Sequence, residues 1–169
     1  MKIQKMTLAG VALCVTLLLG ASCSSDSDDN ATPTPDVPEN PLTPGTNQRP
    51  DWDQTVVDYT RYDSEMPVVV GIQPELAQYA SEKDMMRATI SGETRAWSAQ
   101  PLEWETVDGT ASYKFLLTIG GNAGEGNITL EYYCDQLHRI FTLSEWRDYD
   151  ASTTPTEDGQ PYIPLFYKE

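Results

Sequence analysis

The chain holds few residues in the arrangements that catalysis requires. His138 is the only histidine, and no nucleophile and orienting acid accompany it with the spacing of a known triad. Four glycines lie between residues 120 and 126, but the loop joins two predicted strands instead of opening a helix. We therefore expect a hairpin loop there and not a phosphate cradle. The residues favour a protein that is not an enzyme.

Acidic side chains leave two further kinds of site open. Paired carboxylates can hydrolyse a glycosidic bond, although a small domain has little room for the cleft such an enzyme needs. Asp51 with Asp53, and Asp148 with Asp150, could offer oxygens to calcium, but neither pair has the spacing of a known calcium loop. A single histidine also argues against zinc. We predict no metal and no cofactor.

Aromatic side chains are the better indication of binding. Exposed Trp rings can stack against sugar rings, whereas buried Trp rings serve the core. We predict Trp52, Trp97 and Trp146 as candidate ligand contacts, because two of them flank the strands and Trp97 depends on the turn before it. A two-residue turn at Ser91 would place Trp97 opposite Met86 and toward the core, and one more turn residue would reverse its face. Trp104 shares a strand face with Leu102, so we expect it in the core.

The N-terminus has the order of an export signal. Lys2 and Lys5 precede an apolar run over residues 8–19, and the small residues Gly20, Ala21 and Ser22 follow it directly before Cys23. The apolar run is short for a membrane-spanning helix. Small residues immediately before a cysteine resemble the lipobox of bacterial lipoproteins. That resemblance implies removal of residues 1–22 and acylation of Cys23, which would anchor the chain to a membrane. The alternative is an ordinary signal peptide with a chance cysteine.

Acidic residues follow the cysteine at once. The run from Ser24 to Asn30 contains Asp26, Asp28 and Asp29, and it resembles the export signal of surface-exposed Bacteroidota lipoproteins. The resemblance implies a position on the outer membrane facing the cell exterior, with a periplasm-facing position as the alternative. Six prolines lie between residues 24 and 50, where large apolar side chains are almost absent. We therefore predict a lipidated, acidic, flexible linker over residues 23–50 and a folded domain over 51–169.

The bulk composition agrees with an exported domain. The chain has 169 residues and a net charge of −15, and residues 1–22 contribute two lysines and no acid. This sign disfavours nucleic acid as a partner. Of the three cysteines only Cys134 lies in the predicted domain, which excludes a disulfide within it. Cys134 follows an apolar run, so we expect a buried and inert thiol.

Beyond residue 51 the hydrophobic pattern has a period of two. Short runs separated by turn residues predict seven or eight strands, near residues 67–72, 84–90, 93–98, 102–107, 113–119, 128–133, 139–143 and 162–166. Residues 74–79 could form one helical turn. No long run with a helical period is present. The pattern therefore predicts an all-β fold, an antiparallel Ig-like β-sandwich.

Three segments carry a second resemblance. They are residues 65–70, residues 84–96 and residues 115–133, and together they resemble a small β-sandwich module of Bacteroidota lipoproteins, mostly of uncharacterised function. Thr94 and Ala96 stand where that module usually has Cys and Gly. In the segment Gly92-Glu93-Thr94-Arg95, Gly92 suits a turn with positive φ. We expect Glu93 and Arg95 to pair or to satisfy a loop backbone.

These features together predict a non-enzymatic binding protein at the cell surface. We expect an accessory in nutrient capture, whose ligand is a glycan or a small cofactor such as a corrinoid passed to an outer-membrane transporter. Two alternatives stay open at this point. One is an adhesin or assembly subunit that binds another surface protein, and the other is a small hydrolase.

Overall fold

The structure is a computed structural model that describes residues 40–168. Cys23, Asp26, Asp28, Asp29 and the signal segment lie outside the described residues, so the predictions for them stay predictions. The described chain contains seven strands: β1 (Ser64–Gly71), β2 (Met85–Ile90), β3 (Glu93–Ser98), β4 (Leu102–Glu105), β5 (Ala111–Gly121), β6 (Asn127–Cys134) and β7 (Arg139–Asp148). Only short helical turns accompany them, α1 (Pro74–Ala77), η1 (Trp52–Gln54) and η2 (Tyr59–Arg61).

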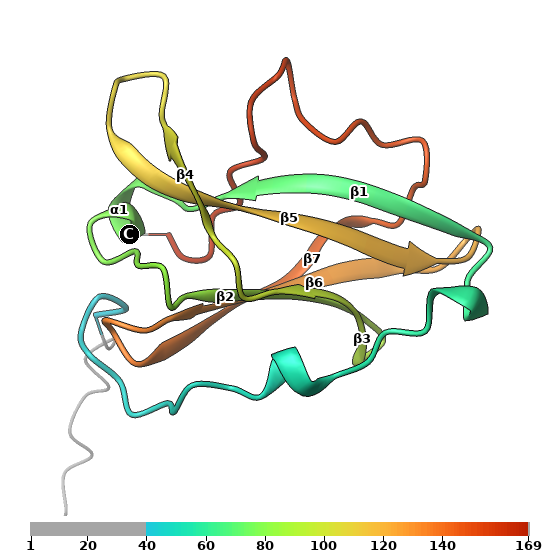
Figure 1. Cartoon of the computed structure of the whole chain (residues 1–169), viewed down its shortest axis with the longest axis horizontal. Coiled ribbons are helices and arrows are strands. Elements are labelled where there is room, and N and C mark those ends of the chain that lie inside the picture. Colours follow the sequence, from blue (N-terminus) through green and yellow to red (C-terminus); the bar gives the residue numbers. More distant parts are fainter. Residues whose placement is uncertain (1–39, 169) are drawn as a thin grey trace, which may run out of the picture. The chain divides into compact units, whose positions relative to one another are not determined.

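The strands form two antiparallel sheets that pack face to face (Figure 1). One sheet has the order β1-β5-β4 and the other has the order β3-β2-β6-β7. Alternate residues of the core strands point into the space between the sheets. Val68 on β1 pairs with Leu117 on β5 in one sheet, and Ala88 on β2 pairs with Leu130 on β6 in the other. This arrangement confirms the predicted all-β sandwich.

The core explains why the period of two governs the sequence. Met66, Phe115, Ile119, Leu130 and Tyr132 have no measurable exposure between the sheets. Each such side chain contributes about 1.5–3 kcal/mol by leaving water. Polar or exposed residues alternate with them along β1, β5 and β6. The pattern therefore fixes the inner face of these three strands.

The β2–β3 hairpin has an irregular register. Ile90 pairs with Glu93 across a two-residue turn in which Ser91 and Gly92 both have positive φ, of 51° and 80°. Thr89 then faces Thr94 while Ala88 faces Ala96, so Arg95 is an additional residue on β3. Such a bulge turns its side chain out of the regular alternation.

The two ends of the described chain differ from the predictions. Residues 40–50 belong to the domain and not to a free linker, because Gly45 N–H donates to the Leu137 carbonyl and Asn47 N–H donates to the His138 carbonyl. At the other end, the predicted strand over residues 162–166 is reduced to one parallel bridge between Tyr162 and Val70. Pro161 and Pro164 flank that bridge, and proline lacks the N–H that a longer ladder needs.

Candidate functional site

Trp52 is buried, although its place outside the strands predicts an exposed ring. Its side chain is only 4% exposed, and the Arg87 guanidinium stacks 4.7 Å from its ring centre. The expectation of an exposed Trp52 is therefore wrong. The ring fixes the η1 segment against Met85 and Tyr133 on the sheet that contains β2 and β6.

Trp97 and Trp146 are partly buried and engaged by the protein itself. The bulge at Arg95 sets Trp97 opposite Arg87 and not opposite Met86, and its indole Nε1–H donates to the Thr55 carbonyl over 2.8 Å. The Trp146 ring meets the Tyr162 ring edge-on, with centroids 6.0 Å apart. Both rings hold neighbouring segments in place, and their contact with a ligand stays a prediction.

Trp104 borders open space at the edge of its sheet. It is partly exposed, and Leu102 on the same strand is 45% exposed, so the prediction of a core position is wrong. Trp104 pairs with Ser112 on β5, and two cavities of about 510 Å³ each share Trp104 and Ala77 in their walls. This size lies within the range of small-molecule sites.

The first cavity, which we call the apolar cavity, lies between the β4–β5 hairpin, α1 and the C-terminal segment. Figure 1 shows this hairpin projecting at the end of the domain where α1 lies. The apolar residues that line the cavity are Ile72, Pro74, Ala77, Trp104, Val107, Pro161 and Ile163. Thr106, Asp108, Thr110 and Gln160 add a few polar groups. Apolar walls with few polar groups are typical of sites that bind an organic ring.

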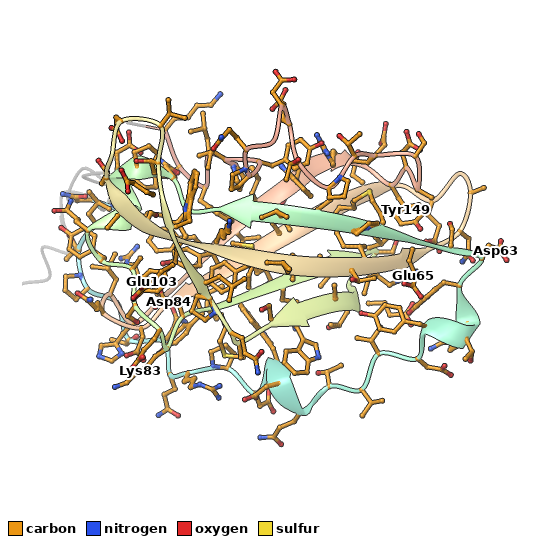
Figure 2. All side chains as sticks on the ribbon, turned by 45° about the horizontal axis from the view of Figure 1, so that its top comes forward. Asp63, Glu65, Lys83, Asp84, Glu103 and Tyr149 are labelled. Atoms are coloured by element: carbon orange, nitrogen blue, oxygen red, sulfur yellow. The ribbon has the colours of Figure 1, made fainter. Side chains whose placement is uncertain are left out.

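The second cavity, which we call the acidic cavity, borders Glu103 and Glu105, which alternate with Trp104 along β4. Its lining residues are two acids, two aromatic residues, one serine and four small residues, namely Glu103, Glu105, Trp104, Tyr113, Ser112, Ala77, Ala80, Gly109 and Ala111. Figure 2 shows Glu103 toward the same end of the domain as Asp84, with Asp63 and Tyr149 toward the opposite end. The site therefore lies at one end of the sandwich.

Hydrogen bonds hold both sides of the apolar cavity in place. In the β4–β5 turn, the Thr106 hydroxyl donates to the Asp108 carboxylate, and the Thr110 N–H donates to the Thr106 hydroxyl over 2.9 Å. Gly109 closes this turn with a φ of 82°, which glycine adopts without strain. The hydroxyl of Thr106 lowers the pKa of the Asp108 carboxyl, so this group is anionic at neutral pH.

The C-terminal wall of the cavity is fastened to β1 and to the residues that follow it. Gly71 N–H donates to the Tyr162 carbonyl over 2.8 Å, and the buried Gln73 side chain accepts from Phe166 N–H over 2.9 Å. Gly71 has a packing role as well, because a Cβ there would lie 2.5 Å from Ile163 Cδ1 and 3.4 Å from Trp104 Cζ2. The missing side chain at Gly71 therefore lets the two walls approach.

The Glu93–Arg95 motif has the structural role that the sequence predicted. The buried Arg95 guanidinium donates to both carboxylate oxygens of Glu125, over 3.1 and 3.0 Å, and to the Gly120 carbonyl over 3.3 Å. Glu93 pairs with it at 3.3 Å, and the Tyr62 ring lies 4.5 Å from its charge. Arg95 thus ties the β5–β6 loop to the neighbouring sheet.

Asp84 is a buried carboxylate that belongs to the scaffold. It accepts from Tyr132 O–H over 2.5 Å, from the Asp135 N–H over 2.9 Å, and from the N–H and hydroxyl of Ser81. Burial raises the pKa of the Asp84 carboxyl, and these hydrogen bonds offset that rise only in part. Cys134 is buried nearby, and burial raises the pKa of its thiol to about 11. The thiol is therefore protonated at neutral pH, as predicted for an inert cysteine.

His138 lies in the tight turn before β7, with a φ of 47°. Among residues 40–168, no three His, Cys, Asp or Glu side chains come together as metal ligands would. The same residues include no helix long and apolar enough to cross a membrane. Comparison with family models, curated proteins and solved structures found no match to this chain.

Sequence reasoning missed the Trp104 site for a physical reason. Leu102 and Trp104 do share one face, but β4 is an edge strand on which no residue is fully buried. The alternation of apolar and acidic residues therefore shows which side chains of β4 share a face, but it does not show whether that face is buried. The only available signal was Pro101 immediately before the strand, since proline is common at sheet edges.

Proposed function

We propose that the protein is a non-enzymatic lipoprotein of the outer cell surface that captures a ligand at Trp104 for nutrient uptake. Cys23 carries the lipid, and the acidic run after it directs the domain to the cell exterior. The ligand is a glycan or another small molecule with a ring of low polarity. An outer-membrane transporter receives it.

The single observation that carries the binding role is the apolar cavity of about 510 Å³ that Trp104, Pro161 and Ile163 line. An indole presents a large flat apolar face, and the CH-rich face of a sugar ring packs well against such a surface. Asp108, Gln160 and Thr106 lie around the apolar cavity, where they can accept from or donate to ligand hydroxyls. Apolar stacking with a few polar contacts is a common design for small-molecule recognition.

Isothermal titration calorimetry of the purified domain against neutral oligosaccharides and corrinoids tests the binding role. We expect Trp104→Ala to weaken binding by at least about tenfold, the equivalent of about 1.4 kcal/mol. Leu116→Ala is the matched control, because Leu116 is 53% exposed on β5 and borders neither cavity. A folded domain that binds no member of the panel, or that binds equally well without Trp104, contradicts the proposal.

The lipid anchor is tested separately in the native host. Intact mass measurement of the mature protein should show a chain that begins at Cys23 and carries acyl groups. Cys23→Ser should release the domain from membranes, and protease added to whole cells should degrade the wild-type domain. Retention of residues 1–22 would exclude the anchor without bearing on the binding site.

A second candidate function is supported by exposed apolar residues on β4 and β5. Leu102 and Leu116 are 45% and 53% exposed and lie in the same sheet as Trp104. Apolar groups on a sheet surface can also contact another protein. Cross-linking in whole cells separates the two functions: a partner protein lost with Leu116→Lys supports an assembly subunit, whereas an unchanged pattern favours ligand capture.

A further inference from the structure

We propose that the apolar cavity takes a mainly hydrocarbon ring that carries a hydrogen-bond acceptor, such as a carbonyl oxygen, and no negative charge. This inference rests on the proposed function and chooses between the two ligand classes that the function leaves open. It follows from three features of the cavity: the direction of the Trp104 indole, the polar groups that the protein has already paired, and the charge of the lining.

The Trp104 indole presents the edge that carries its N–H to the apolar cavity. Its Cζ2 atom lies 3.4 Å from the position that a Cβ on Gly71 would take, and Pro161 Cβ and Ile163 Cδ1 lie 3.3 and 2.5 Å from the same point. Cζ2 and Nε1 are both bonded to Cε2, so this edge of the ring faces Pro161 and Ile163. Both of these residues line the apolar cavity, as Trp104 itself does.

The N–H on that edge is a donor without an acceptor. It is buried and has no hydrogen-bond partner among the described residues. Ser112 pairs with Trp104 on the neighbouring strand and so shares its sheet face, and the Ser112 hydroxyl is also buried and unpaired in the described structure. A buried polar group without a partner has lost its water and gained nothing in return. A ligand acceptor that reaches the indole N–H therefore adds more to binding than it would at an exposed donor.

The other polar groups of the lining offer little to a sugar. The Thr106 hydroxyl donates to the Asp108 carboxylate, and the Thr110 N–H donates to both of these side chains, over 2.9 and 3.2 Å. Besides Trp104, only the side chains of Thr110 and Gln160 have no hydrogen bond among the described residues that line the cavity. A sugar ring carries a hydroxyl on most of its carbons, and each hydroxyl that turns into the cavity without a partner weakens binding. A mainly hydrocarbon ring covers the apolar wall without that cost.

The charge of the lining disfavours an anion. Asp108 is the one ionisable residue among the described residues that line the cavity, and the hydrogen bond from Thr106 lowers the pKa of its carboxyl. Lys114 Nζ lies 5.9 Å from the Trp104 ring centre, but Lys114 does not line the cavity. A carboxylated ligand would bring a second negative charge beside Asp108, and the two charges would repel one another. Because Asp108 is exposed, added salt should weaken this repulsion.

Three compounds on one ring system test the inference: coumarin, chromene, which lacks the carbonyl, and coumarin carboxylate, which adds an anion. Proton–nitrogen NMR spectra follow each titration, because the four Trp residues give four indole N–H signals and Trp104→Phe identifies the signal of Trp104. We expect coumarin to shift that signal downfield, as a new hydrogen bond does, and to bind at least about fivefold more tightly than chromene. Coumarin carboxylate should bind more weakly than coumarin, and Asp108→Asn should reduce that difference.

Two Trp variants assign the preference for the carbonyl to one donor. Trp104→Phe keeps an aromatic ring and removes the N–H, so it should abolish the preference for coumarin over chromene, whatever apolar contact both compounds lose. Trp52→Phe is the matched control, because it removes the N–H of a buried ring that lines neither cavity, and it should leave the preference unchanged.

The outcomes separate this inference from the proposed function. If chromene binds as tightly as coumarin, if the preference survives Trp104→Phe, or if coumarin leaves the Trp104 signal in place, the inference fails. If a neutral oligosaccharide binds through Trp104 and coumarin does not, the inference fails while the proposed function stands. If neither the ring compounds nor the oligosaccharides and corrinoids bind the folded protein, both fail.

Discussion

Removing Glu125 should destabilise the domain far more than removing an exposed acid, because Glu125 neutralises a buried cation. The Arg95 side chain is 6% exposed and Glu125 is 23% exposed, and two hydrogen bonds of 3.0 and 3.1 Å join them. Burial raises the pKa of the Glu125 carboxyl, but the hydrogen bonds from Arg95 and Asn122 together outweigh it and leave the pKa lowered. The carboxylate is therefore ionised in the folded domain at neutral pH.

The magnitude follows from the geometry of the pair. Breaking a fully buried ion pair costs about 3–5 kcal/mol, because the remaining charge is left without a partner in the weakly polar interior of the protein. Here Glu125 is partly solvated and Glu93 still lies 3.3 Å from Arg95, so part of the charge stays compensated. We expect Glu125→Ala to lower the free energy of unfolding by about 2–3 kcal/mol.

Equilibrium unfolding in urea, followed by far-ultraviolet circular dichroism, measures this loss. Arg61→Ala is the matched control, because Arg61 forms an ion pair of 3.1 Å with Glu93 but is 63% exposed. Its removal should cost less than about 1 kcal/mol. In a double-mutant cycle with Arg95→Met, Glu125→Ala should lose most of its effect. A cost for Glu125→Ala no larger than that for Arg61→Ala would refute the reasoning.

Three further predictions test other parts of the structure. Burial raises the pKa of Asp84 in the folded state, so the contribution of this carboxyl to stability should be largest below about pH 4 and should decline as the pH rises through its pKa in the folded domain. Urea unfolding measured at a series of pH values should show this decline in the free energy of unfolding. Asp84→Asn should abolish it. Cys134 should react with a thiol reagent only as fast as the domain unfolds, so rapid labelling of the native protein would contradict its burial. Gly71→Ala should push the Ile163 side chain into the apolar cavity, which should weaken ligand binding in calorimetry with little loss of thermal stability. Gly126→Ala is the control, because a Cβ there meets open space, and it should change neither ligand binding nor thermal stability.

The core strands could be predicted from the sequence because burial on one face imposes a period of two. The alternation over residues 113–119 and 128–133 predicts strands that fall within β5 and β6, and the residue types Ser91 and Gly92 predict the turn between β2 and β3. The pairing of Glu93 with Arg95 also followed from their places on one strand. Local pattern and turn chemistry were sufficient for these features.

The partner of Arg95 was not predictable by the same reasoning. Glu125 lies 30 residues further along the chain, and the bulge that directs Arg95 toward it is a property of the strand pairing. The position of Trp52 was missed in a similar way, since its burial depends on contact with β2 and β6 across a segment without regular structure. Both are consequences of packing between distant segments.

The sequence by itself determined that this chain forms antiparallel strands, which residues of each core strand face inward, and that Cys134 has no cysteine partner within the domain. Each of these depends on residue type and spacing along one segment. Only the tertiary structure decided that Trp104 borders two cavities, because that requires β4 at a sheet edge, Ala77 of α1 in the same walls and the C-terminal segment fastened by Gln73. A cavity is the space left between segments, and no single segment encodes it.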